Sequence, residues 1–200
     1  MITKDVKHNL REHYRELFRQ HGAVAAGVQG SEEGMIGRYE QFRKVADLSG
    51  QSVLDLGCGF GALYSYLCQF NTTMKYKGID LVPESIAYAA RTFPDAKWEC
   101  RDILENPLTE QFDWVLICGV FNNAIPEPTD FLKDLTSAAW KTANKGMAFN
   151  FISKHVNVVD EGMAYHDPLE VFEFCRSSFS SKVSMAHHYF RCDVSIFVYR

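Results

Sequence analysis

The sequence contains no long hydrophobic run and no excess of basic residues. Its longest apolar stretch, at about residues 114–121, is far shorter than the ~20 residues that a membrane-spanning helix needs. Its 21 basic and 25 acidic residues give a net charge of −4, which argues against the concentrated positive surface of a nucleic-acid-binding protein. The first residues lead into a charged segment without an apolar signal sequence, so we expect no export. These absences predict a protein whose partners include neither a membrane nor a nucleic acid.

Closely spaced cysteine pairs are also missing. None of the six cysteines forms a Cys-x-x-Cys pair, which disfavours a zinc ribbon and a redox dithiol. No group of side chains has the spacing of metal ligands, so we expect no metal. A reduced, cytoplasmic protein is the simplest interpretation of this cysteine content.

The chain divides into two parts with different patterns. Residues 1–50 are predicted to be helical, with apolar side chains such as Val6 and Leu10 at helical spacing, and we expect them to form a lid over a site. The basic side chains of this segment are interleaved with acidic ones, which is typical of a solvated helix face. Residues 51–200 alternate between strands and helices and are predicted to form the core domain. The expected strands lie at 52–56, 76–80, 97–101, 113–118, 146–151, 182–188 and 194–199.

This alternation predicts an α/β fold of the Rossmann-like kind. Helical crossovers between the first five strands imply a mostly parallel sheet with helices on both faces. The last two strands are joined by only a short turn, so they must be antiparallel. We therefore expect a seven-stranded sheet with its last strand reversed, and a ligand at the carboxyl ends of the parallel strands.

A glycine-rich turn follows the first predicted strand of the sheet. The segment 53–63 reads VLDLGCGFGAL, a strand that runs through Gly57 and Gly59 into a helix. Glycine allows unusual backbone angles and a close approach of a ligand to the main chain. The spacing also fits a dinucleotide fingerprint, and a purely structural tight turn is the alternative.

Acidic residues near the ends of three successive strands point to the kind of ligand. Asp80 ends the second strand, 21 positions after Gly59, where a carboxylate can accept hydrogen bonds from both ribose hydroxyls. Asp102 follows the third strand and is placed to contact an adenine amino group, although alone it is as well explained as a cap. Asp55 lies two residues before the first glycine, where it would repel a pyrophosphate but suits a cationic amine or sulfonium.

These segments resemble the successive motifs of the class I S-adenosylmethionine-dependent methyltransferases. The resemblance rests on VLDLGCGFG at 53–61, YKGIDLVPES at 76–85, WECRDIL at 98–104 and FDWVLICG at 112–119, and it covers residues 51–151. The final HHYFRCDVSIFVYR resembles the terminal antiparallel strand pair of that fold. Within that family, the sequence most resembles small stand-alone enzymes that methylate small molecules.

The resemblance implies that S-adenosylmethionine binds along the ends of the first four strands. The glycines would pack under the cofactor, Asp80 would hold the ribose, and Asp102 with Ile103 the adenine. Cys118 and Gly119 would border the reactive end. Apart from the resemblance, Arg38 of the N-terminal segment is a candidate to pair with a carboxylate of the cofactor or of the acceptor, with an ordinary exposed arginine as the alternative. The cofactor-binding residues that we expect are Asp55, Gly57, Cys58, Gly59, Asp80, Leu81, Asp102, Ile103, Cys118, Gly119 and Arg38.

Candidate acceptor-binding residues come from the lid and from the segment after the fourth strand. We expect the substrate contacts to be made by Tyr14, Tyr39, Phe121, Asn122 and Asn123, the two asparagines having an ordinary turn as their alternative. No prolines follow Asn122, so the DPPY or NPPY motif of nucleic-acid amino methylases is absent.

Two histidines are candidates for a general base. His155 and His166 follow the fifth strand, and an imidazole has a suitable pKa for this role. The alternative for each histidine is an ordinary structural or surface position without a catalytic role.

The sequence thus predicts transfer of a methyl group to an O or N atom of a small molecule, with S-adenosylhomocysteine as the second product. The alternatives are a non-catalytic methyltransferase-like binding module and, less well supported, a nicotinamide-dependent oxidoreductase. An apolar face on the lid would serve a homodimer interface as easily as a closed pocket.

Overall fold

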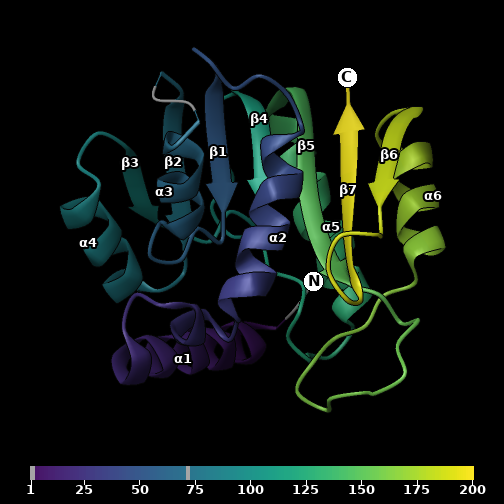
Figure 1. Cartoon of the computed structure of the whole chain (residues 1–200), viewed down its shortest axis with the longest axis horizontal. Coiled ribbons are helices and arrows are strands. Elements are labelled where there is room, and N and C mark those ends of the chain that lie inside the picture. The colour runs from purple at the N-terminus through teal and green to yellow at the C-terminus, as the bar shows by residue number, and fades with distance from the viewer. Residues whose placement is uncertain (1–2, 71–72) are drawn as a thin grey trace.

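A seven-stranded sheet runs through the centre of the molecule (Figure 1). The computed structural model describes residues 3–70 and 73–200. Its strands are β1 (Ser52–Leu56), β2 (Lys75–Asp80), β3 (Lys97–Cys100), β4 (Phe112–Ile117), β5 (Ala143–Ile152), β6 (Lys182–Ala186) and β7 (Asp193–Tyr199). They follow the order β3-β2-β1-β4-β5-β7-β6. Neighbours from β3 to β5 pair in parallel, whereas β7 is antiparallel to both β5 and β6. The predicted fold class is confirmed.

The helices mostly begin where the sequence supplies a side-chain cap or a proline. They are α1 (Lys4–His21), the short 3-10 helix η1 (Ala25–Val28), α2 (Glu32–Arg43), α3 (Ala62–Cys68), α4 (Pro83–Thr92), α5 (Pro128–Thr142) and α6 (Pro168–Ser178). The Thr3 hydroxyl accepts a hydrogen bond from the Val6 amide, and the Asp167 carboxylate caps α6. The crossover from β3 to β4, residues 101–111, contains no helix, contrary to the pattern expected for every crossover. Pro107 stands in the middle of this short connection, where it would interrupt a helix.

Two apolar layers fix the helices on opposite faces of the sheet. On one face, Phe42 of α2 and Leu67 of α3 pack with Leu116 of β4. On the other, Leu132 of α5 and Val171 of α6 pack against the sheet in a second buried cluster. The side chains of β5 alternate between these clusters, as a strand buried on both faces requires. Helix α2 therefore belongs to the packed core layer.

Helix α1 occupies a different place, across the carboxyl ends of β1, β2 and β3 (Figure 1). None of its described side chains is fully buried, so packing alone does not hold it there. The division into a lid at 1–50 and a core domain at 51–200 stays a prediction. Within the described residues, no helix combines the length and the apolar character needed to cross a membrane.

Candidate active site

The glycine turn after β1 forms the floor of a cavity. The amides of Gly57 and Cys58 donate to the carbonyl oxygen of Ile79, at 2.8 and 3.1 Å, which ties the turn to the end of β2. Gly57 has a φ of +77°, and a Cβ atom there would lie 2.2 Å from Cγ2 of Val120. A side chain at this position would therefore be strained and would clash. Gly57 and Gly59 both line the cavity and expose their main chain to it.

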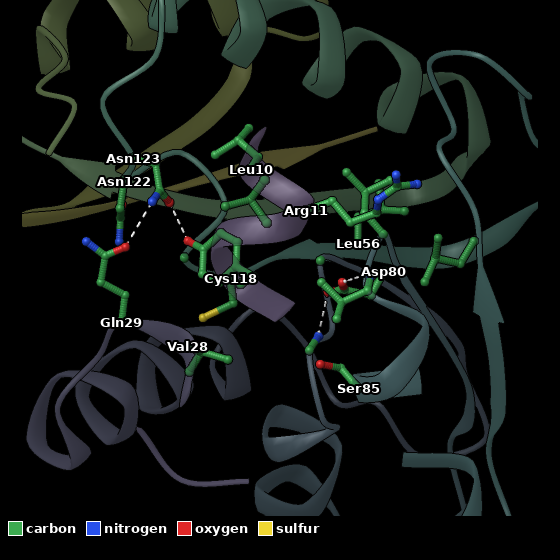
Figure 2. A pocket seen from close by; sticks show the side chains of 18 of the residues that line it. Leu10, Arg11, Val28, Gln29, Leu56, Asp80, Ser85, Cys118, Asn122 and Asn123 are labelled. Atoms are coloured by element: carbon green, nitrogen blue, oxygen red, sulfur yellow. Dashed lines mark hydrogen bonds between the residues drawn. The ribbon is translucent and has the colours of Figure 1, made fainter. Parts of the chain in front are cut away.

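Asp80 faces the same cavity from the end of β2. Its Oδ2 accepts a hydrogen bond from the Gly59 amide at 2.8 Å, and its Oδ1 accepts one from the Val82 amide at 2.9 Å. Burial raises the pKa of the Asp80 carboxyl, and these amide hydrogen bonds act in the opposite direction. The carboxylate is thus fixed in orientation while each oxygen keeps a further lone pair for a ligand hydroxyl (Figure 2).

Asp102 also lines the cavity and is held by a side chain of helix α1. The ammonium of Lys7, in α1, lies 2.6 Å from Asp102 Oδ2, and the Leu104 amide donates to Oδ1 at 2.8 Å. The Lys7 and Asp102 side chains are 12% and 18% exposed, so water is largely excluded from the pair. Ile103 is buried beside it and presents an apolar wall to the cavity.

The segment after β4 forms the middle of the cavity. Gly119 donates its amide to Asn150 Oδ1 at 2.7 Å, which holds the turn onto β5. From α2, Arg38 donates its Nε to Asp193 Oδ2 at 2.7 Å, and the two side chains are only 15% and 3% exposed. Burial raises the pKa of the neighbouring Cys118 thiol, so it stays neutral rather than becoming a thiolate nucleophile.

A chain of polar contacts closes the far end of the cavity. The Tyr14 hydroxyl donates to Asn123 Oδ1, and Asn123 Nδ2 donates to Gln29 Oε1 at 2.9 Å. His13 Nε2 lies 2.8 Å from the same Gln29 oxygen. Asn122 also lines the cavity, but its Oδ1 is shielded from water and has no hydrogen-bond partner among the described residues.

The structure brings most of the predicted site residues together. Those that line the cavity are Tyr14, Arg38, Tyr39, Gly57, Gly59, Asp80, Leu81, Asp102, Ile103, Cys118, Gly119, Asn122 and Asn123. The sequence reasoning missed Lys7, Gln29 and Met163. The interleaved charges around Lys7 indicated a solvated face, and for this residue that expectation was wrong, because its ammonium pairs with Asp102. Asp102 is distant in the sequence, so the local charge pattern did not reveal the pair.

Asp55 and Cys58 lie beneath the glycine turn instead of in the wall of the cavity. Both are buried, and Asp55 Oδ2 accepts a hydrogen bond from the Tyr76 hydroxyl. Burial raises the pKa of Asp55 to about 7, with the negative charge of Asp80 adding to the effect and the Tyr76 bond opposing it. Any action of Asp55 on a cationic ligand is therefore through space, without direct contact.

Phe121, His155 and His166 also fall outside the described cavity lining. Phe121 packs in the core against Phe149. His166 is buried, with Nε2 lying 3.1 Å from the Phe121 carbonyl oxygen and Nδ1 3.3 Å from Thr129 Oγ1. Burial lowers the pKa of His166, which keeps the imidazole neutral. His155 is exposed on the loop after β5.

Comparison with known proteins agrees with this geometry. Residues 53–141, from β1 to the end of α5, match a family model described as a methyltransferase domain. The chain therefore contains a methyltransferase domain, as the resemblance of its motifs predicts. It is 28% identical over 156 residues to the putative methyltransferase Rv1506c of Mycobacterium tuberculosis, a match that covers 74% of this chain and 92% of the relative.

Two solved structures of similar fold contain S-adenosylhomocysteine. Magnesium protoporphyrin IX methyltransferase from Synechocystis PCC 6803 has a TM-score of 0.72 at 17% identity, covering 98% of this chain and 100% of that one. The N-methyltransferase NodS from Bradyrhizobium japonicum has a TM-score of 0.67 at 16% identity, covering 94% and 97%. At these identities the likeness supports the seven-stranded fold of this methyltransferase.

Proposed function

We propose that this methyltransferase transfers the methyl group to an O or N atom of a small-molecule acceptor by direct in-line displacement. The supporting observation is one cavity that extends from Asp80 and Asp102 to the polar contacts around Asn122 and Asn123. Its first part suits a nucleoside, and its second part presents the side chains that we expect to contact an acceptor. The names of the two structural relatives, a porphyrin methyltransferase and an N-methyltransferase, favour a small molecule.

The residues present fit S-adenosylmethionine. Asp80, oriented by two amides, would accept hydrogen bonds from the ribose hydroxyls, and Asp102 with Ile103 would hold the adenine. The open main chain at Gly57 and Gly59 would support the middle of the cofactor. Arg38, whose charge is offset in part by Asp193, would meet the carboxylate of the cofactor. When bound, the cofactor supplies an electrophilic methyl group on a sulfonium.

The protein's part in the reaction is alignment. Reacting atoms must be held about 3–3.5 Å apart, and water must be kept away. Tyr14 and Tyr39 from the N-terminal segment cover the site, and Asn122 and Asn123 define its acceptor end. Burial raises the pKa of the Tyr14 hydroxyl, so this group acts as a hydrogen-bond donor at neutral pH.

A general base at His155 or His166 stays a prediction. Neither histidine is among the described residues that line the cavity, and a neutral amine acceptor would need no base before attack. A cytoplasmic location also stays a prediction, which the six free cysteines fit. The same holds for an absence of nucleic-acid partners and for a homodimer formed through the lid.

Calorimetric titration with S-adenosylhomocysteine tests the cofactor assignment. We expect Asp80→Ala to abolish binding because the ribose loses its acceptor, while Asp95→Ala, at an exposed position, binds as wild type does. Circular dichroism checks that the Asp80 variant keeps its fold. Unchanged affinity in that variant would overturn the assignment.

Thermal unfolding with three ligands separates the alternatives. A ligand at 100 times its Kd adds about 2.7 kcal/mol, which for a chain of this length raises Tm by about 5–10 °C. We expect this rise with S-adenosylmethionine and S-adenosylhomocysteine and none with NADH. A rise with NADH alone would favour the oxidoreductase, and cofactor binding without methylation of any acceptor would favour the binding module.

A further inference from the structure

Asn122 and Asn123 are neighbours in sequence but differ in how their side chains are used. Asn123 is satisfied at both ends, by the Tyr14 hydroxyl and by Gln29. Asn122 Oδ1 has no hydrogen-bond partner within residues 3–70 and 73–200, although it is shielded from water. A buried amide oxygen without a donor is costly, so its retention points to a donor that arrives with a ligand.

The position of Asn122 is fixed by its backbone. Its carbonyl oxygen accepts a hydrogen bond from the Ala164 amide at 2.8 Å, and the Ala124 amide donates to the Gly162 carbonyl at 3.0 Å. These bonds, with the bridge between Asn123 and Met163, join the segment to the loop that follows β5. The unpartnered oxygen therefore belongs to a rigid wall, and the side chain does not act as a turn cap.

The missing donor comes from the acceptor and not from the cofactor. Figure 2 shows Asn122 and Asn123 on one side of Cys118, and Asp80 and Ser85 on the other. The nucleoside end is thus separated from Asn122 by the segment that borders the reacting atoms.

Apolar side chains that line the same cavity as Asn122 bear on the chemistry of the acceptor. Met35, Met163 and Val28 line the same cavity and offer apolar contacts. A carboxylate brings only hydrogen-bond acceptors, which would face the Asn122 oxygen unfavourably. The positive charge of Arg38 does not call for an acceptor carboxylate, because Asp193 already lies 2.7 Å from its Nε.

We propose that Asn122 Oδ1 accepts a hydrogen bond from the N–H or O–H group that is methylated, and that the acceptor is an apolar amine or hydroxyl compound rather than a carboxylic acid. This inference rests on the proposed function. Asn122 orients the lone pair of the acceptor toward the methyl carbon. The acceptor atom forms the new bond as the carbon–sulfur bond breaks, and the electron pair of the carbon–sulfur bond stays on sulfur. The methylated product then gives its extra proton to bulk water as it leaves the site.

Three probes of one shape test the acceptor class. The enzyme is incubated with S-adenosylmethionine carrying a labelled methyl group and with 2-naphthylamine, 2-naphthol or 2-naphthoate. We expect label in the amine or the hydroxyl compound and none in the carboxylate. Methylation of 2-naphthoate, or of none of the three, would overturn the proposal.

Variants then test the residue. Asn122→Leu removes the oxygen at similar size, Asn122→Asp keeps an acceptor oxygen, and Asn157→Leu is a control on the exposed loop after β5. We expect the leucine variant at 122 to lose about tenfold in kcat/KM for the methylated probe. Asn122→Asp should retain most of this activity, and Asn157→Leu should match wild type. Equal activity of the two leucine variants would refute the role of Asn122.

Two further measurements distinguish a failure of the role proposed for Asn122 from a failure of the proposed function. The Tm of ligand-free Asn122→Leu should rise by a few degrees because an unpaired buried oxygen is removed, and a fall would show that Asn122 has a structural partner instead. The Kd for S-adenosylhomocysteine should be the same in all variants. If the wild type did not bind S-adenosylhomocysteine, the proposed function itself would be refuted. If it bound S-adenosylhomocysteine but lacked the expected acceptor selectivity, only the role of Asn122 would be refuted.

Discussion

The buried carboxyl of Asp55 makes the stability of this enzyme depend on pH in a defined direction. Burial raises the pKa of Asp55 to about 7, so the folded protein holds a proton there that the unfolded chain, with an ordinary value of 3.8, has already lost. The folded state therefore binds more protons than the unfolded state between these two values. Stability falls as pH rises through this window, and the full cost is present above pH 7.

The size of the effect follows from the two pKa values. Linkage gives a cost of about 2 kcal/mol at pH 5 and about 4 kcal/mol at pH 8. Replacing Asp55 by Asn removes the titration while keeping an oxygen for the Tyr76 hydroxyl. The variant should therefore gain about 2–3 kcal/mol relative to wild type between pH 5 and pH 8. Any pH-independent effect of the amide cancels in this comparison.

Urea unfolding followed by tryptophan fluorescence measures the free energy of unfolding at both pH values. The same gain should appear as an additional Tm difference of about 5–10 °C at pH 8. Asp47→Asn is the control, because Asp47 is exposed and hydrogen bonds from Ser49 lower its pKa, so it does not titrate in this range. If the effect of Asp55→Asn were the same at pH 5 and pH 8, the carboxyl would titrate normally in the fold and the reasoning would be wrong.

Two other variants test contacts that the fold creates. Lys7→Met should lower the free energy of unfolding by about 1–2 kcal/mol, because it leaves the largely buried Asp102 without its partner. Arg19→Met, on the exposed face of α1, is the control and should have no measurable effect. Equal losses of the two variants in urea titrations would contradict this. His166→Gln should remove the loss of stability that wild type shows as pH falls below about 6.5, because the buried neutral imidazole gains its proton only on unfolding. Urea titrations at pH 5.5 and 7.5 check this, and an unchanged pH dependence would show that His166 is protonated in the folded state.

The sequence by itself determined the order of strands and helices, the glycine turn and the acids at the strand ends. These features depend on local rules, since strand runs, caps and glycine spacing act over a few residues. Asp80 and Asp102 could be placed because the carboxyl ends of parallel strands meet at one edge of a sheet. The same rule brought Cys118 and Gly119 to that edge.

The tertiary structure alone decided which side chains face the cavity. Tyr14 meets Asn123 across 109 positions of the chain, and Arg38 meets Asp193 across 155. No periodicity within one element encodes such contacts, because they depend on how separate elements pack. For the same reason the sequence could not distinguish Asn122, with its unpartnered oxygen, from its satisfied neighbour.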